Sequence, residues 1–168
     1  VLPYVVVACL AGLAGCSVFE RPQRPAWRGQ AEAACLAEKR VVASEFLRPA
    51  SAIEGPGICG MDRPFKVTAF AGGAMPIAQG VTLACPAISE IDRWIADVVI
   101  PTAQTRFGQP VVALTSTGGY SCRGMNNQIG ARLSEHSFGN ALDIGGFVLA
   151  DGRKIVIRRD WTRGDEQT

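Results

Sequence analysis

The segment of residues 134–146, SEHSFGNALDIGG, constrains the fold of this chain more than any other part of the sequence. It contains the single histidine, His136, and seven residues later a carboxylate, Asp143. In a straight strand these side chains would lie about 23 Å apart and point to opposite faces, and in a helix they would lie about 10 Å apart along the axis. Both could bind one small ion, whose ligand bonds are about 2 Å long, only if the chain turned back between them.

The expected turning point is Gly139-Asn140, because both residue types tolerate left-handed backbone angles. Beyond it, Leu142 and Ile144 can face a core while Asp143 faces the opposite side. The sequence therefore predicts a buried strand that brings one carboxylate next to the imidazole. The simpler alternatives are a histidine that is packed in the core or exposed at the surface, and a carboxylate that caps a turn.

Hydrophobic spacing predicts the other elements of one compact domain, which 168 residues with 48% hydrophobic and 19% charged composition can form. The predicted helices are residues 30–48, ended by Pro49, and residues 86–100, which Pro101 is expected to kink or end. The predicted strands are residues 65–70, 81–85, 110–116, 141–149 and 154–157, with loops at 51–64 and 71–80. This pattern indicates an α+β fold with two helices on a small, mainly antiparallel sheet.

The N-terminal segment indicates export. Residues 1–14 are apolar but fall short of the roughly 20 residues that a membrane-spanning helix needs, so they predict the apolar region of a signal peptide. Residues 13–16, LAGC, resemble a bacterial lipoprotein signal, in which the cysteine becomes the first mature residue and carries the lipid. Ser17 after that cysteine resembles the pattern for sorting to the outer membrane. The alternative is a buried helix with an incidental cysteine.

This interpretation divides the chain into three parts. They are a signal peptide at residues 1–15, a lipidated Cys16 with a proline-containing tether at residues 16–29, and a folded domain at residues 30–168. The basic segment that precedes the apolar region of a signal peptide is absent, so the natural chain is expected to begin earlier.

Four cysteines remain for the folded domain once Cys9 leaves with the signal and Cys16 is lipidated. An exported protein meets an oxidising compartment, in which disulfides persist. The sequence leaves every pairing of the four open, and the absence of a C-x-x-C pair argues against a zinc site built from cysteines. The four disulfide candidates are Cys35, Cys59, Cys85 and Cys122.

The histidine-to-aspartate segment also resembles a known motif. Its pattern Ser-x-His-x-x-Gly-x-Ala-x-Asp is similar to that of the zinc D-alanyl-D-alanine peptidases, which include dipeptidases and carboxypeptidases acting on peptidoglycan stem peptides. Upstream, GGYSCR with Asn127 and Gly130 resembles a second segment of that group. The stretches SEHSFGNALDIGGFVLADGR and RDW are closer still to the bacterial extensin-like C-terminal domain family, over about residues 30–161.

The resemblance implies a zinc D-Ala-D-Ala peptidase-like fold, with a zinc ion bound by His136 and Asp143. It implies that Arg123 stabilises the substrate carbonyl oxygen as negative charge develops, a role that suits a permanently charged guanidinium. Zinc would lower the pKa of a bound water. The expected partners are peptidoglycan peptides and, through the anchor, a lipid membrane on the periplasmic side of the bacterial envelope, at the outer membrane. A net charge of +2 gives no reason to expect nucleic acid.

The expected zinc site is incomplete in this sequence. A catalytic zinc takes three protein ligands, and the relatives use a later histidine and a nearby base, whereas His136 is the only histidine here. Glu135 does not suit the base, because it neighbours His136 and would point away from it in an extended chain. Ser134 has no second histidine to activate it as a nucleophile. The sequence is therefore expected to be a truncated hydrolase or a catalytically inactive one, and the alternative is a non-catalytic, wall-binding or structural envelope lipoprotein.

Overall fold

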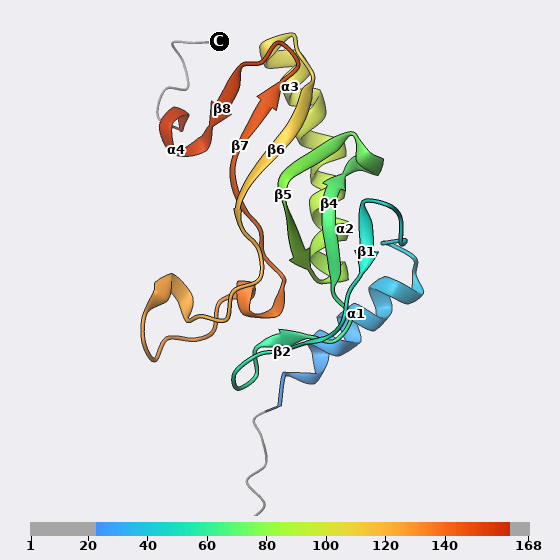
Figure 1. The fold of residues 1–168 in the computed structure, drawn as a ribbon, viewed down its shortest axis with the longest axis vertical. Coiled ribbons are helices and arrows are strands. Elements are labelled where there is room, and N and C mark those ends of the chain that lie inside the picture. Colours follow the sequence, from blue (N-terminus) through green and yellow to red (C-terminus); the bar gives the residue numbers. More distant parts are fainter. Residues whose placement is uncertain (1–22, 162–168) are drawn as a thin grey trace, which may run out of the picture.

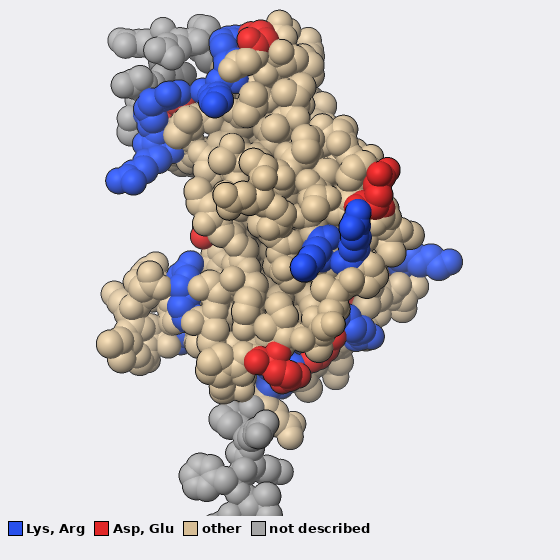
Figure 2. All heavy atoms as spheres, viewed as in Figure 1, with Lys and Arg blue, Asp and Glu red and all other residues tan. Residues whose placement is uncertain are grey.

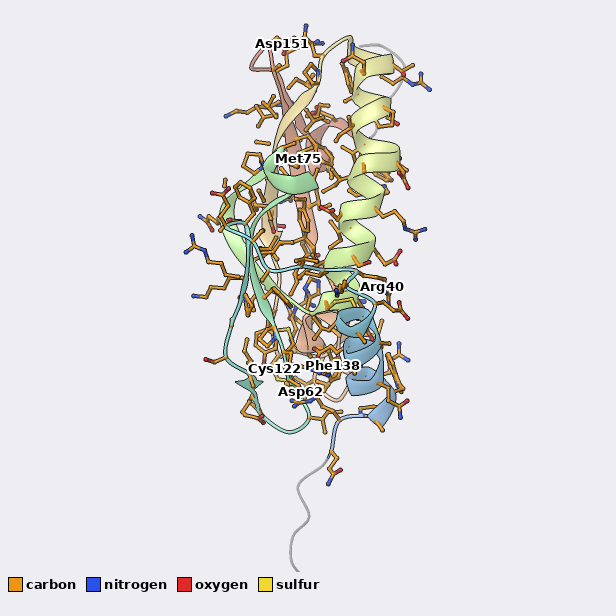
Figure 3. The ribbon with its side chains drawn as sticks, turned by 90° about the vertical axis from the view of Figure 1, so that its right-hand side faces the viewer. Arg40, Asp62, Met75, Cys122, Phe138 and Asp151 are labelled. Carbon is orange, nitrogen blue, oxygen red and sulfur yellow. A yellow bond between two sulfur atoms is a disulfide. The ribbon has the colours of Figure 1, made fainter. Side chains whose placement is uncertain are left out.

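The computed structural model describes residues 23–161, which form a layer of helices on one face of a sheet (Figures 1 and 3). Within these residues the main sheet is six-stranded, in the order β1-β4-β5-β6-β7-β8, and every neighbouring pair is antiparallel except β5 and β6. The predicted α+β fold with a mainly antiparallel sheet is confirmed. The strands are β1 (Leu47–Pro49), β4 (Phe65–Phe70), β5 (Met75–Leu83), β6 (Val111–Gly118), β7 (Asp143–Leu149) and β8 (Lys154–Val156).

The helices and a separate hairpin complete the described part of the chain. The hairpin pairs β2 (Ile53–Glu54) with β3 (Gly60–Met61). None of the helices in residues 23–161 has the length and apolar character that crossing a membrane requires. The helices are α1 (Ala26–Ala37), α2 (Cys85–Trp94), α3 (Ile100–Phe107) and α4 (Ile157–Asp160), with single turns at η1 (Ala71–Gly73), η3 (Met125–Asn127) and η4 (Glu135–Phe138).

The core lies between the sheet and the α2–α3 helix. β4 matches the predicted strand, and its side chains alternate as expected, with Phe65 and Val67 buried and Lys66 exposed. Ile88 and Ile95 on the predicted apolar helix face are almost fully buried against the sheet. Burying one such side chain stabilises the fold by about 1.5–3 kcal/mol, so this interface holds the two layers together.

The predicted helix at residues 30–48 is correct only in its first half. α1 begins earlier, so residues 26–29 of the expected tether belong to it. Its end is set by a backbone reversal, in which Lys39 has a positive φ of 54° and the Arg40 N–H donates to the carbonyl of Cys35 (3.0 Å). Apolar residues beyond this reversal therefore belong to other elements.

Pro49, which was expected to end that helix, lies instead in β1 at the edge of the sheet. An edge strand tolerates proline because one of its sides has no strand partner. Val41 and Leu47 both reach the core, but from a turn and from a strand. The spacing of these apolar residues matches that of one continuous helix, so the helix was predicted to extend to residue 48.

The second predicted helix is longer than residues 86–100 and continues from α2 through the π-helical segment η2 (Ile95–Val99) into α3. Pro101 was expected to kink or end it, yet the helix runs on to Gly108, whose positive φ of 62° caps it. Proline cannot donate a hydrogen bond to the preceding turn. The wider turn of η2 lies immediately ahead of Pro101 and accommodates the missing bond.

The strands after β4 differ from the prediction mainly in length. Residues 71–80, predicted as a loop, contain the first half of β5, and the predicted loop at residues 51–64 contains the β2–β3 hairpin. The second half of β5 matches the strand predicted at residues 81–85, but its first half was missed. Ala78, Gln79 and Gly80 are all exposed, so the alternation of buried and exposed residues typical of a strand is lost there. β6 extends two residues beyond the predicted end at Ser116, and β7 and β8 are slightly shorter than predicted.

Two disulfides select one of the pairings that the sequence left open. Cys35 of α1 is bonded to Cys85 at the start of α2, and Cys59 is bonded to Cys122. All four candidates are therefore paired. The expected signal peptide and the lipidated Cys16 lie outside the described residues.

Candidate functional site

His136 lies in η4, a single turn whose two ends are both capped. The Ser134 hydroxyl accepts a hydrogen bond from the His136 backbone N–H (3.4 Å) and so braces the start of the turn. Gly139 follows with a positive φ of 62°, so the predicted turn is present. The Gly139 carbonyl accepts from the Ala84 N–H (2.9 Å), which fastens the turn to the junction between β5 and α2.

The turn brings His136 and Asp143 together, as predicted. The imidazole Nε2 lies 3.3 Å from the Asp143 Oδ1. Asp143 opens β7 with its side chain 52% exposed, while Leu142 and Ile144 pack against the core. The His136 side chain is only 9% exposed. The imidazole is therefore enclosed by the protein, whereas the Asp143 carboxylate faces solvent.

A backbone carbonyl determines which nitrogen of His136 faces the carboxylate. The imidazole Nδ1 lies 2.6 Å from the carbonyl oxygen of Gly119. A carbonyl can only accept, so Nδ1 carries the hydrogen and donates it. A neutral imidazole then directs the Nε2 lone pair at the Asp143 carboxylate. Two electron-rich atoms at 3.3 Å need a cation between them, either a proton or a metal ion.

Arg123 approaches the same carboxylate from the other side. Its Nη2 lies 4.0 Å from the Asp143 Oδ2, too far for a direct hydrogen bond but close enough for an ion pair. The Arg123 side chain is 29% exposed. The three predicted site residues are therefore brought together in one place.

A buried serine that the sequence did not single out holds the Arg123 backbone. Ser137 is fully buried, and its hydroxyl accepts from the Arg123 N–H (3.1 Å) and lies 3.0 Å from the Arg123 carbonyl oxygen. The same hydroxyl is 3.2 Å from the carbonyl of Ser121. The Cys59–Cys122 disulfide ties the neighbouring residue to the β2–β3 hairpin. Arg123 is thus presented from a fixed segment, although a serine next to histidine carries no specific signal in sequence.

Glu135 points away from the His136–Asp143 pair and is occupied elsewhere. Both of its oxygens accept from Arg28 (2.8 and 2.7 Å), and one also accepts from the Asn140 amide (3.1 Å). The Arg28 hydrogen bonds hold the pKa of Glu135 below its usual value. Arg28 also stacks 3.7 Å above the ring of Phe138. Glu135 therefore anchors η4 to α1 and is not placed to act as the base.

A small cavity of about 80 Å³ lies on the α1 side of this turn, at the end of the molecule where Figure 3 labels Asp62 and Phe138. Glu32 of α1 lines it and is buried, and burial, with a smaller contribution from Asp62, raises the pKa of its carboxyl. Arg28 and Met61 also line it. This cavity therefore lies next to Arg28 and Phe138, which hold the turn, and His136 and Asp143 do not line it.

A second hollow is lined by two residues that contact this pair, Gly118 and Gly119. A slot of about 340 Å³ lies between residues 79–82 of β5 and residues 116–120, which end β6 and begin the next loop. Gly118 pairs with Asp143 across the β6–β7 ladder, and Gly119 provides the carbonyl for His136. The slot therefore shares two backbone residues with the support of the His136–Asp143 pair, although neither His136 nor Asp143 lines it.

Among the described residues, the candidate metal site has two ligands, His136 and Asp143. No group of three or more His, Cys, Asp or Glu side chains suited to an ion occurs within residues 23–161. His136 and Asp143 offer an imidazole nitrogen and a carboxylate oxygen, both of which zinc binds. A third protein ligand is not among the side chains gathered here.

Comparison with known proteins gives one finding. The model of the family described as "Extensin-like protein C-terminus" matches residues 33–168, which is most of the chain. No curated protein and no solved structure matches. The matched range contains the histidine turn, Arg123 and both disulfides.

Proposed function

The chain belongs to the extensin-like protein C-terminus family, and from this premise we propose that it is a zinc-dependent hydrolase of peptidoglycan stem peptides. The observation that carries the proposal is the approach of His136 Nε2 to Asp143 Oδ1, with Nδ1 committed to a backbone carbonyl. A metal-binding histidine ordinarily donates its second ring N–H to such a carbonyl or to a carboxylate.

The residues present fit zinc as two of its ligands. A separation of 3.3 Å between the two donor atoms is one that ligands about 2 Å from a shared ion can have. When bound, zinc would act as a Lewis acid and make water acidic enough to be a nucleophile near neutral pH. A catalytic zinc takes about three protein ligands, so the proposal requires one more ligand than this pair supplies.

Arg123 is proposed to stabilise the negative charge that develops on the substrate carbonyl oxygen. Its guanidinium stays charged at every relevant pH and presents several N–H donors in one plane. Its backbone is fixed by Ser137, and its charge lies beside the carboxylate of Asp143. A donor held in place before the reaction costs little reorganisation in the transition state.

The chain is further proposed to act on the periplasmic side of the envelope, anchored at the outer membrane by lipid on Cys16. The support is the LAGCS segment, together with two disulfides that persist only in an oxidising compartment. Stable attachment needs more than one acyl chain, since a single chain binds a membrane only marginally.

The decisive test is to measure zinc content and peptide cleavage on the same samples. The chain, with whatever native sequence adjoins it, is purified and assayed for bound metal and for release of D-alanine from a stem pentapeptide. His136→Ala and Asp143→Asn are expected to lose both zinc and cleavage. Asp97→Asn, an exposed position on the π-helical segment, serves as the control and should retain both.

The second candidate is a wall-binding protein without activity, and the two-ligand limit of residues 23–161 favours it. It predicts that the chain binds stem peptides without cleaving them and that a chelator leaves this binding unchanged. Stoichiometric zinc together with chelator-sensitive cleavage would exclude it.

A further inference from the structure

We infer that the Cys59–Cys122 disulfide is a redox switch for the candidate site, which a small dithiol opens while the disulfide between α1 and α2 stays closed. The bond holds residues 119–123, here called the arginine segment, against the β2–β3 hairpin. This segment supplies Arg123 and the Gly119 carbonyl that fixes the imidazole. As regulation of a hydrolase the inference rests on the proposed function, whereas its structural readouts do not.

The two disulfides differ in how easily a reagent can reach them. Cys35 and Cys85 are 0% exposed and lie in the packed helices α1 and α2. Cys59 is also buried, but Cys122 lies at the surface of the molecule. Thiol–disulfide exchange requires a thiolate to reach one sulfur, so access decides which disulfide reacts first. A reagent in solution can meet Cys122 in the folded protein, whereas α1 and α2 must separate before either of their sulfurs is reached.

The exchange is a two-electron reduction with a defined order. A thiolate of the dithiol attacks the Cys122 sulfur, the S–S bond to Cys59 breaks, and Cys59 leaves as a thiolate that takes up a proton. The second thiol of the reagent then displaces Cys122 from the mixed disulfide and closes the reagent's own disulfide. Two electrons and two protons pass from the dithiol to the protein, which gains two free thiols.

The arginine segment is held from two sides. On one side η4 binds its backbone, because the Ser121 N–H donates to the His136 carbonyl (3.0 Å). The Arg123 N–H donates in the same way to the Ser137 hydroxyl (3.1 Å). On the other side the segment is joined to the hairpin by the disulfide. Residues 119–123 belong to no helix or strand, so the covalent bond constrains a segment that no regular secondary structure stabilises.

The arginine segment is expected to open locally once the bond is cut. Ser121 is exposed, as Cys122 is, and residues 124–133 project from the body of the molecule as a loop (Figures 1 and 2). Segments with exposed backbone hydrogen bonds and few buried side chains open at a low cost in free energy. The disulfide joins residues 63 positions apart, and cutting it returns conformational entropy to the open state. Reduction should thus release both Arg123 and the Gly119 carbonyl from their positions in the site.

The first test is time-resolved trapping of free thiols. The full chain, folded and at neutral pH, is treated with dithiothreitol, and the thiols that appear are blocked with iodoacetamide and assigned by mass spectrometry. Cys59 and Cys122 should become free at least about ten-fold faster than Cys35 and Cys85. Equal rates for the two pairs, or reduction of neither pair until the protein unfolds, would overturn the inference.

The second test measures loosening of the arginine segment by amide hydrogen exchange. In Cys59→Ala/Cys122→Ala, and in the selectively reduced wild type, exchange at the two segment amides that bond η4 should quicken about ten-fold or more. The matched control is Cys35→Ala/Cys85→Ala, which removes a cross-link of similar span, 50 positions against 63, and so a similar share of stability. This control should leave exchange at those two amides unchanged. If both double variants quicken it alike, global stability accounts for the effect and the inference fails.

Cleavage separates this inference from the proposed function. If the wild type cleaves stem peptide, Cys59→Ala/Cys122→Ala should cleave it about ten-fold more slowly, measured as kcat/KM, while the control double variant keeps the wild-type rate. Full cleavage by Cys59→Ala/Cys122→Ala keeps the hydrolase and overturns the switch. A wild type that cleaves nothing removes the hydrolase, and thiol trapping and hydrogen exchange then decide whether the disulfide opens selectively and releases the segment.

Discussion

Glu135 and His136 are adjacent in sequence, but their side chains contact different parts of the molecule. Glu135 faces outward and bonds Arg28 of α1, while His136 faces inward and bonds Gly119. Glu135 therefore helps to hold the turn in place, while the Gly119 carbonyl orients the imidazole. Residue-scale changes at this turn should alter stability and site geometry in ways that can be measured separately.

The Arg28–Glu135 contact predicts a pH dependence. Because the pKa of Glu135 is lowered in the folded chain, the contact contributes its full stability above the ordinary carboxyl value of 4.5 and loses it as the pH falls further. The wild type should therefore exceed Glu135→Gln in melting temperature near pH 7, and the difference should shrink below pH 4.5. A difference that stays constant on acidification would contradict this account.

Gly139 predicts a second effect. An alanine there would adopt a φ of 62° and place its Cβ in direct overlap with the Met61 side chain, the sulfur above all. Gly139→Ala should destabilise the fold by about 2 kcal/mol or more in urea unfolding, from backbone strain plus crowding. Gly108→Ala is the matched control, because Gly108 has the same φ but open space around its Cβ. Equal losses for the two variants would show that Met61 imposes no constraint.

At the scale of elements, the sequence predicted those whose pattern is local. β4 alternates over its first five residues and was correctly bounded, and the turn before β7 follows from Gly139 and the alternation around Asp143. α1 was predicted too long because apolar residues that belong to other elements continue its helical spacing. β5 was predicted too short because its pairing is irregular, and an irregular strand loses the alternation of buried and exposed residues. The Arg28–Glu135 pair joins residues 107 positions apart, and no local pattern predicts such a contact.

The disulfide between α1 and α2 predicts an element-scale effect. Cys35 and Cys85 are fully buried and 50 positions apart, so their bond restricts a long loop of the unfolded chain. The double variant Cys35→Ala/Cys85→Ala should lose about 2–4 kcal/mol of stability in denaturant unfolding. A double variant as stable as the wild type would show that α1 is held by packing and by Arg28 alone.

At the scale of the whole molecule, composition and hydrophobic spacing were sufficient for the fold class. They could not predict the parting of β5 and β6, because a register is set by the partners on both sides of a strand. The same applies to the candidate site: His136 and Asp143 could be inferred from one segment, whereas Ser137 and the slot exist only once several elements have assembled.

The proposed anchor gives a prediction for the whole chain. In a Gram-negative host, Cys16→Ser should abolish incorporation of labelled palmitate and move the protein from the membrane fraction to the soluble periplasmic fraction. Cys9→Ser, within the expected signal peptide, is the control and should leave both unchanged. Labelling that persists in Cys16→Ser would exclude this cysteine as the lipid site.

The Cys35–Cys85 bond also determines how mechanical tension crosses the molecule. A pull applied ahead of α1 reaches Cys35 after a few helical turns and passes through the sulfurs into α2. The intervening stretch of residues 36–84, with β1, β4 and β5, is bypassed and carries no load along its covalent backbone. A chain tugged from its N-terminal end would thus keep one wall of the slot unstrained for as long as that cross-link is oxidised.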